Sequence, residues 1–248
     1  MALTAQDLAF SYGLRRRKVL DNLCWQVPTT GRTILLGPNG AGKSTLLRLL
    51  AGALRARHGE VFISGPDGSR IEGKGLRRHV SWMPQDIVPV RGLTVREQVA
   101  YAGWLGGLTA KEAQRRTATT LEQVSLSDKA DSRSDSLSGG QLRRLGLAES
   151  LVLQADYLLL DEPTAGLDPA QRANFRQVLL NLPPCGLVVS THQIDDIADV
   201  FDRVAVIVAG TILFDGSVRD FHTLGQVEPG SRASTEQAFM SFLRGADH

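Results

Sequence analysis

Short apolar segments alternate with segments of helical periodicity along most of the 248-residue chain. A short apolar run bounded by turn residues is typical of a buried strand. Continuous apolar strands that alternate with helices indicate a parallel sheet covered on both faces, so the pattern predicts an α/β fold. The predicted strands are 3–10, 19–27, 33–36, 60–63, 80–83, 157–160, 187–190 and 203–208, and the helices between them include 43–50 and 169–182.

The middle of the chain has a different pattern, because helical periodicity replaces the alternation there. Helices are predicted over 94–105 and 109–126, and a third helix begins at 138 and runs to about residue 152. The segment 86–153 is therefore predicted to be a helical insert. Each helix opens with a capping-box pattern, in which Ser or Thr precedes Glu or Gln by three residues: Thr94 with Glu97, Thr109 with Glu112, and Ser138 with Gln141.

These elements predict a single domain of residues 1–248. Residues 1–85 and 154–215 form its α/β core with an N-terminal β region, and residues 86–153 form a helical subdomain. Residues 216–248 form a C-terminal tail with two short helices, 217–224 and 235–243.

The composition of the chain favours a folded globular domain over several other classes of protein. Apolar residues are 42% and charged residues 22% of the chain, which is typical of a folded globular domain. Lys and Arg exceed Asp and Glu by only 28 to 26, so bulk charge gives no support to a nucleic-acid partner. The longest apolar stretch, near 204–214, is shorter than the ~20 residues that span a bilayer, so a membrane role would need a partner. Cys24 and Cys185 lie far apart, outside any metal-ligand spacing, and we expect two buried thiols.

A glycine-rich loop joins the predicted strand 33–36 to the helix 43–50. Its sequence matches G-x-x-x-x-G-K-[ST], the phosphate-binding P-loop. Glycines let backbone N–H groups approach phosphates, and a helix N-terminus favours negative charge. Lys43 adds a point charge for the β- and γ-phosphates, and Ser44 offers a hydroxyl to Mg²⁺. The pattern predicts that the phosphates of a nucleotide bind with Mg²⁺ at Gly37, Pro38, Asn39, Gly40, Ala41, Gly42, Lys43, Ser44 and Thr45.

Two carboxylates, Asp161 and Glu162, follow the apolar strand 157–160. Open α/β sheets bind ligands at the carboxyl ends of their strands. We expect Asp161 to hold Mg²⁺ and Glu162 to orient and deprotonate the attacking water. Such a pair is often only a helix cap or a loop anchor, but a P-loop in the same chain favours the catalytic interpretation.

A second group of exposed amide donors begins the third predicted helix, at Ser138, Gly139, Gly140 and Gln141. A helix start of this kind can bind an anion, although a capped helix without a ligand is the alternative. Because the P-loop already binds a nucleotide in its own chain, a second phosphate-binding helix end suggests contact with the nucleotide of a second chain.

The P-loop, the LSGGQ sequence of 137–141, the acidic pair and Ser190-Thr191-His192 occur in the order of an ATP-binding cassette (ABC) ATPase. The chain resembles that family over nearly all of residues 1–215, and LSGGQ is highly specific to it. The resemblance implies a P-loop α/β core with an N-terminal antiparallel β region and a helical subdomain. It also implies contact between His192 and the γ-phosphate.

The resemblance implies roles for three more residues. Gln85 looks like a glutamine that contacts Mg²⁺ and the γ-phosphate and reports them to the helical insert. Tyr12 resembles the aromatic that stacks on adenine, with Phe10 as the rival. Asp168 resembles an aspartate at the seam between two chains. One departure lies at Glu149, where Arg or Gln is more usual.

The family resemblance also implies partners. Two copies of the chain are expected to enclose two ATP molecules and to drive a separate integral membrane permease, from the cytoplasmic face of the membrane. The sequences MPQD, LTVRE, RRLGLA and EPTAGLDP resemble the subfamily that powers export of drugs, lipids or polysaccharides. The alternatives are an importer ATPase and an ATPase without a permease, such as an iron–sulfur-cluster assembly ATPase.

Two surface patterns stay open. The basic run 15–18 suggests a nucleic-acid or phospholipid contact, but a solvated loop between strands is the simpler interpretation. Tyr101, Trp104 and Leu105 have helical spacing and could face a membrane partner, or they could pack the small core of the insert.

Overall fold

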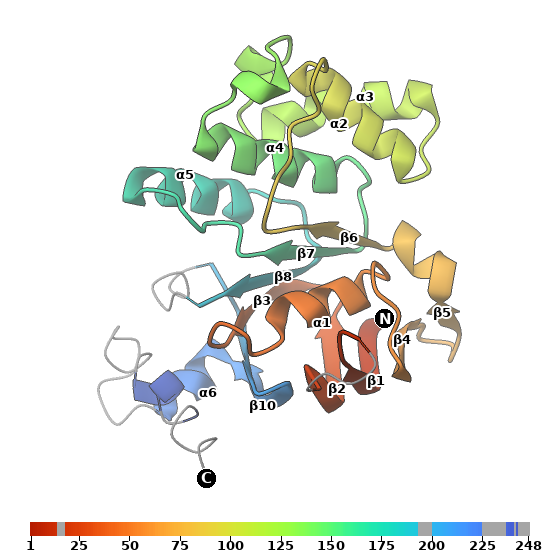
Figure 1. Cartoon of the computed structure of the whole chain (residues 1–248), viewed down its shortest axis with the longest axis vertical. Coiled ribbons are helices and arrows are strands. Elements are labelled where there is room, and N and C mark those ends of the chain that lie inside the picture. Colours follow the sequence, from red (N-terminus) through yellow and green to blue (C-terminus); the bar gives the residue numbers. More distant parts are fainter. Residues whose placement is uncertain (14–17, 193–199, 225–236, 241, 243–248) are drawn as a thin grey trace.

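The computed structural model describes residues 1–13, 18–192, 200–224, 237–240 and 242. Its larger sheet has six strands in the order β10-β9-β3-β8-β7-β6. The five strands from β9 to β6 are parallel, and β10 joins the edge antiparallel. The predicted α/β fold is therefore confirmed (Figure 1). The strands are β3 (Gly31–Leu36), β6 (Val80–Met83), β7 (Tyr157–Asp161), β8 (Gly186–Thr191), β9 (Arg203–Val208) and β10 (Thr211–Ser217).

A second, antiparallel sheet contains the N-terminal strands in the order β2-β1-β4-β5. This confirms the N-terminal antiparallel β region. Leu3 and Leu8 of β1 and Leu23 of β2 are buried between the two sheets. The elements are β1 (Ala2–Phe10), β2 (Leu20–Pro28), β4 (His58–Ser64), β5 (Arg70–Glu72) and the 3₁₀ helix η1 (Gly73–Arg78).

Successive residues of the parallel strands belong to different cores. In β3, Ile34 and Leu36 belong to the core on the side of the later helices, whereas Leu35 belongs to the core shared with α1 (Lys43–Leu50) and the antiparallel sheet. Side chains alternate between the faces of a strand, so a strand buried on both faces must be apolar throughout. This double burial explains the continuous apolar runs in the sequence.

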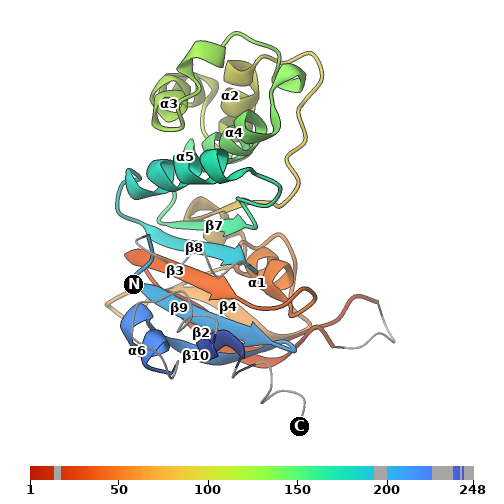
Figure 2. The same ribbon diagram turned by 90° about the vertical axis from the view of Figure 1, so that its left-hand side faces the viewer.

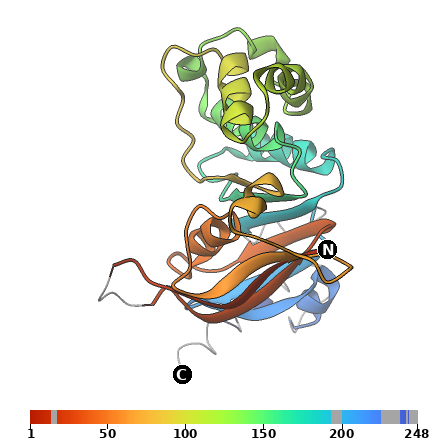
Figure 3. The ribbon, with the colours of Figure 1, turned by 90° about the vertical axis from the view of Figure 1, so that its right-hand side faces the viewer.

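Helices cover the other face of the parallel sheet. Figure 2 shows α5 lying across β7 and β8, with α2, α3 and α4 beyond it, and Figure 3 shows this group at the end of the molecule opposite to the antiparallel sheet. We call α2–α4 the helical group. The elements are α2 (Val95–Leu105), α3 (Ala110–Gln123), η2 (Ser127–Lys129), η3 (Ser134–Ser136), α4 (Gly139–Leu151) and α5 (Pro169–Leu180).

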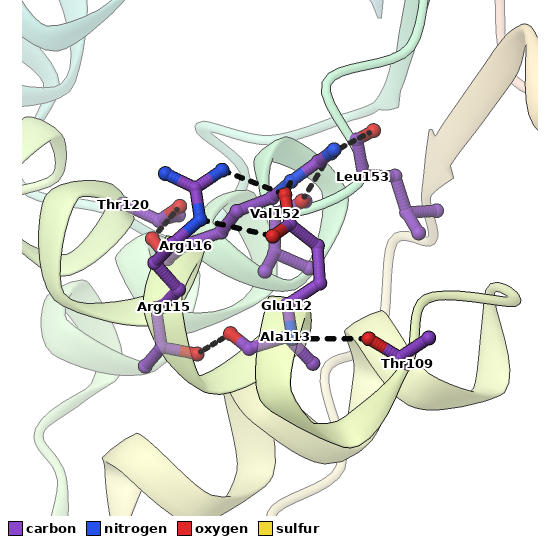
Figure 4. Close-up of polar contacts among 9 residues, drawn as sticks. Thr109, Glu112, Ala113, Arg115, Arg116, Thr120, Val152 and Leu153 are labelled. Carbon is purple, nitrogen blue, oxygen red and sulfur yellow. Dashed lines mark hydrogen bonds and ion pairs between the residues drawn. The ribbon is translucent and has the colours of Figure 1, made fainter.

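The three predicted capping boxes have different outcomes. Thr94–Glu97 and Ser138–Gln141 are complete, with side-chain and backbone bonds in both directions. The box at Thr109 is only half formed, because its hydroxyl accepts from the Glu112 N–H but the Glu112 carboxylate does not return the bond. That carboxylate instead accepts from the two arginines of the next turn, Arg115 and Arg116 (Figure 4).

Arg116 also fastens α3 to the end of α4. Its guanidinium donates to the carbonyls of Leu153, at 2.9 Å, and Val152, at 3.5 Å (Figure 4). The last carbonyls of a helix lack partners within the helix, so a cation placed there stabilises it. Glu112 holds the same guanidinium at 2.7 Å, and the helical group is thus tied together away from the parallel sheet.

The structure also tests the predictions for the C-terminal tail and for the two cysteines. The first tail helix is confirmed as α6 (Val218–Thr223), and residues 237–240 and 242 are helical within the second, whose other residues lie outside the described ones. The expectation of two buried thiols is wrong, because Cys24 is exposed and Cys185 is half-buried. In the part of the chain that the structure describes, no helix has the length and apolarity needed to cross a membrane.

Candidate functional site

Four neighbouring parallel strands end at one cavity of about 440 Å³. The chain after β3 forms the P-loop, and the chain after β6, β7 and β8 brings Gln85, Glu162 and His192. This is the carboxyl edge at which open α/β sheets bind ligands. The cavity is lined by Tyr12, Val19, Pro38, Asn39, Gly40, Ala41, Gly42, Lys43, Ser44, Thr45, Gln85, Glu162 and His192.

The P-loop backbone requires glycine at two places. Gly42 is the N-cap of α1 and has φ of 107°, in the region where other residues are strained. A side chain at Gly37 would overlap the backbone of Ile207 in β9. The loop therefore packs closely on the sheet and presents the start of α1 to the cavity, which is an arrangement suited to a phosphate.

Lys43 is buried with its ammonium inside the loop. Its Nζ donates to the carbonyls of Gly37, at 2.7 Å, and Pro38, at 3.3 Å, and lies 3.4 Å from the Glu162 carboxylate. Burial lowers the pKa of Lys43, although Glu162 and Asp161 oppose this shift. A phosphate entering the loop would add negative charge beside this buried ammonium and further offset the cost of its burial.

Asp161 lies at the end of β7 and is fully buried. Its Oδ1 accepts from the hydroxyls of Ser44, at 2.9 Å, and Ser190, at 2.7 Å. Its Oδ2 is also buried and has no hydrogen-bond partner among the described residues. A buried carboxylate oxygen without a partner is energetically costly, and a cation beside Ser44 would relieve that cost.

Glu162 is held in a strained backbone position beside His192. Its φ of 47° is unusual for a residue other than glycine, and its N–H donates to the carbonyl and hydroxyl of Ser190 at 3.1 Å. The His192 Nδ1 lies 3.0 and 3.1 Å from the two carboxylate oxygens. The carboxylate is thus fixed between His192 and Lys43, at the wall of the cavity.

Burial distinguishes the two candidate aromatics. Phe10 is 9% exposed and belongs to the core between the sheets, whereas Tyr12 is 40% exposed and lines the cavity. The two rings meet edge to face at 5.0 Å, and the Tyr12 hydroxyl lies 3.2 Å from the Thr45 Oγ1. Tyr12 is therefore the aromatic available to a ligand.

The residues Ser138–Gln141 lie outside this cavity. Ser138 and Gly139 are exposed at the start of α4, and a Cβ added at Gly139 would meet no atom within 4 Å. The buried Gly140 instead packs on Gln171 of α5, whose N–H donates to Asp168 at 2.8 Å. The structure thus gathers Ser138–Gln141 and Asp168 on one surface, separate from the P-loop of the same chain.

One residue of the site had no predicted role of its own, although it belongs to the Ser190-Thr191-His192 motif. Ser190 donates to Asp161 and accepts from the Glu162 N–H, so it fixes both carboxylate-bearing residues. The sequence feature that could have predicted this role is the place of Ser190 at the end of an apolar strand. A hydroxyl there reaches the matching position of the adjacent parallel strand, since Asp161 and Ser190 are paired in register.

Comparison with known proteins identifies the family. Its model, described as ABC transporter, matches residues 20–165. The chain is 39% identical over 222 residues to the cobalt import ATP-binding protein CbiO of Rhodobacter capsulatus, covering 88% of this chain and 78% of that protein. It is 32% identical over 219 residues to the lipopolysaccharide export system ATP-binding protein LptB of Haemophilus influenzae, covering 87% and 90%.

The fold is also found among solved structures. An ATP-binding cassette solved as a dimer in a post-hydrolysis state, bound to ADP and Pi, matches with a TM-score of 0.75 at 23% identity. The match covers 88% of this chain and 99% of that one. The family model and the two relatives show that the chain belongs to the ABC transporter family, and that it is an ATP-binding and ATP-hydrolysing subunit of an ABC transporter.

Proposed function

We propose that two copies of this chain enclose two ATP molecules, each held by the P-loop of one copy and by Ser138–Gln141 of the other. The observation that carries this proposal is the separation of the two groups within one chain. The P-loop lines a cavity with Glu162 and His192, whereas Ser138 is exposed and Gly139 faces open space. A helix N-terminus with exposed amide donors suits a phosphate brought by another chain.

The cavity residues are proposed to divide the work of hydrolysis. Lys43 binds the β- and γ-phosphates, and Glu162, which His192 orients, takes a proton from the attacking water. Tyr12 stacks on adenine, while Gln85 and His192 contact the γ-phosphate. The residues of P-loop positions 37–45 surround the triphosphate, and Asp168 lies at the seam with the second chain.

Mg²⁺ fits the donor set of this site. Ser44 and Asp161 would hold it, with Gln85 in the wall of the same cavity, and the unpartnered Asp161 Oδ2 offers a place for a cation. The described residues contain no cluster of three or more His, Cys, Asp or Glu that could hold a metal alone, and Mg²⁺ commonly shares its ligands with substrate phosphates. When bound, the ion would neutralise part of the phosphate charge.

A membrane permease is the proposed partner, and an exposed apolar surface on the helical group supports it. Tyr101 and Trp104 stack at 5.9 Å on α2, and Trp104 and Leu105 are 54% and 63% exposed, so they do not fill the core of the insert. Val88, on the segment before α2, is also exposed. Exposed apolar patches mark protein interfaces. We place the subunit at the cytoplasmic face of the membrane through this contact.

Export is the proposed direction of transport, on the sequence motifs, and an importer or a permease-free ATPase is the alternative. Co-purification from detergent-solubilised native membranes tests the partner. We expect an integral membrane protein to accompany the wild-type chain and to be lost with Tyr101→Ser/Trp104→Ser, while ATP binding is retained. Recovery of the wild-type chain without any integral membrane protein would favour the permease-free ATPase. Inside-out vesicles that carry the complex distinguish the directions, because export loads them and import empties them.

A further inference from the structure

Three residues of α4 at three-residue spacing face the segment that leads from β6 to α2, two by direct contact and the third through a side chain of α2. They are Arg143, Gly146 and Glu149, and residues three apart lie on one face of a helix. The segment begins near Gln85, in the wall of the nucleotide cavity, and runs beside α4 toward the start of α2 (Figure 1). One face of the helix that begins with Ser138–Gln141 therefore follows the segment that leaves the cavity.

The first two contacts fix the beginning of the segment. The Arg143 guanidinium donates to the carbonyl of Gln85 and, at 3.2 Å, to that of Ala165. One turn along, Ile87 is buried against Gly146, where any added Cβ would overlap its side chain. These contacts place the backbone at Gln85 directly on α4.

The third contact is indirect and passes through Gln98 of α2. Gln98 is only 2% exposed, and its amide makes three hydrogen bonds. Its Oε1 accepts from the Val90 N–H at 2.8 Å, and its Nε2 donates to the Val88 carbonyl at 3.2 Å and to the Glu149 Oε1 at 2.6 Å. The bonds to Val90 and Glu149 need opposite ends of the amide, so its orientation is fixed.

Glu149 is an unusual group at this place, because it is half-buried and carries a carboxyl. Burial raises the pKa of its carboxyl, and within the described part of the chain its hydrogen-bond partner is Gln98, with no cation that offsets its charge. An apolar side chain would fill the same volume without desolvating a carboxylate. An apolar side chain at this position could not accept the hydrogen bond from Gln98, so this bond is what distinguishes Glu149 from a residue that only fills space.

We propose that Glu149 is a positioning residue that acts through Gln98 to hold the Val88–Val90 segment on α4. The link keeps Gln85 in the cavity wall, and it couples displacement of the exposed Val88 to the helix that presents Ser138–Gln141. The consequence for catalysis rests on the proposed function of Gln85 and Ser138–Gln141. The anchoring of Val90 does not rest on it.

A pair of variants at this position separates hydrogen bonding from packing. Glu149→Gln keeps an acceptor oxygen for Gln98, whereas Glu149→Leu keeps only the apolar bulk. For Glu149→Leu we expect kcat for ATP hydrolysis to fall about tenfold, the size expected for losing one hydrogen bond to a charged group, with monomer ATP affinity and KM unchanged. Hydrogen exchange of the Val90 amide should speed up. Glu149→Gln should stay near wild type in both measurements.

Arg116→Gln is the matched control, because it loosens the C-terminal end of α4 from α3 (Figure 4) without touching the segment. It should lower the melting temperature and leave kcat and Val90 exchange unchanged. Gln98→Met removes the same hydrogen bonds from the side of α2. It is used in place of Glu149→Leu if Glu149→Leu does not fold. The proposal is overturned if Val90 exchange is unchanged in Glu149→Leu, if Glu149→Gln is as impaired as Glu149→Leu, or if Arg116→Gln lowers kcat equally. A different outcome would count against the proposed function instead. In that outcome, Val90 exchange speeds up in Glu149→Leu, but the wild-type chain does not dimerise with ATP.

Discussion

The nucleotide cavity and the start of α4 are the two places where we propose that phosphate binds, and they differ in how complete they are. In the cavity, Lys43, Ser44, Asp161 and Glu162 bond one another or the loop backbone before any ligand binds. At the start of α4, Ser138 and Gln141 satisfy each other in a capping box, and Gly139 faces open space.

The two places differ in whether one chain supplies all the groups that would surround a phosphate. The cavity gathers residues from the ends of four strands of one chain, so we expect a single copy to bind a nucleotide. The surface of Ser138–Gln141 has donors and a helix dipole but no further wall. We therefore expect it to bind phosphate only when another molecule closes it.

The largest effect is expected from Lys43→Ala. The variant removes the buried ammonium from the loop, an electrostatic contribution typically worth about 3–4 kcal/mol in the transition state. ATP hydrolysis should be abolished and ATP binding weakened, as measured by steady-state phosphate release and by calorimetry on the dilute chain. Near-normal hydrolysis would contradict the role of the P-loop.

Glu162→Gln is expected to reduce turnover by about 10²–10⁴, the usual contribution of a positioned base. The amide keeps the shape of the side chain beside His192, so ATP affinity should be retained. The ATP-bound dimer should then persist in size-exclusion chromatography with Mg·ATP. A variant that stays monomeric at high protein concentration would count against the two-chain arrangement.

Tyr12→Leu should weaken ATP binding by about 10–100-fold, because stacking of an aromatic on a base is worth roughly 1–3 kcal/mol. Tyr12→Phe is the control, since it keeps the ring and loses only the contact with Thr45. Calorimetric titration with ATP measures both. Equal losses in the two variants would assign the effect to the hydroxyl rather than to stacking.

The smallest effect is expected in the helical group, at Glu112. Hydrogen bonds from Arg115, and then from Arg116, lower the pKa of Glu112 from 4.5 to about 2. A lowered pKa in the folded state stabilises the fold above about pH 4.5, and this stabilisation is lost as the pH falls toward 2. Glu112→Gln should therefore show a smaller loss of stability over this range in denaturant titrations, with unchanged ATP affinity at pH 7. An unaltered acid profile would contradict this origin of the acid sensitivity.

Local patterns predicted most of the cavity. The P-loop needs only a strand, a glycine-rich turn and a helix in sequence order, and Asp161 and Glu162 follow a strand that is apolar on both faces. The family of the chain could be predicted from the same motifs, since LSGGQ stands in its expected order. The comparisons confirm that family, whereas the direction of transport stays a prediction, since relatives of both kinds match.

Contacts between distant segments could not be predicted. The sequence favours Tyr12 over its rival Phe10, but only burial assigns Phe10 to the core. The half-formed box at Thr109 depends on two arginines that compete for Glu112, and a capping pattern does not weigh such competition. Ser190 and the link between Gln98 and Glu149 depend on sheet register and on helix packing. A sequence pattern specifies neither of these.

The most direct test of the central claim adds a carboxylate at Gly139. In Gly139→Asp, the P-loop cavity is untouched, so the dilute chain should bind ATP with its wild-type affinity. The new charge would face a γ-phosphate held by the second chain, and like charges at an interface cost several kcal/mol. ATP-dependent dimerisation should therefore fall by at least about 100-fold, measured by analytical ultracentrifugation beside the monomer affinity. Gly68→Asp, in an exposed turn with open space, is the control and should change neither quantity. If Gly139→Asp weakens monomer ATP binding as much as dimerisation, Ser138–Gln141 acts within its own chain, and the two-chain account is wrong.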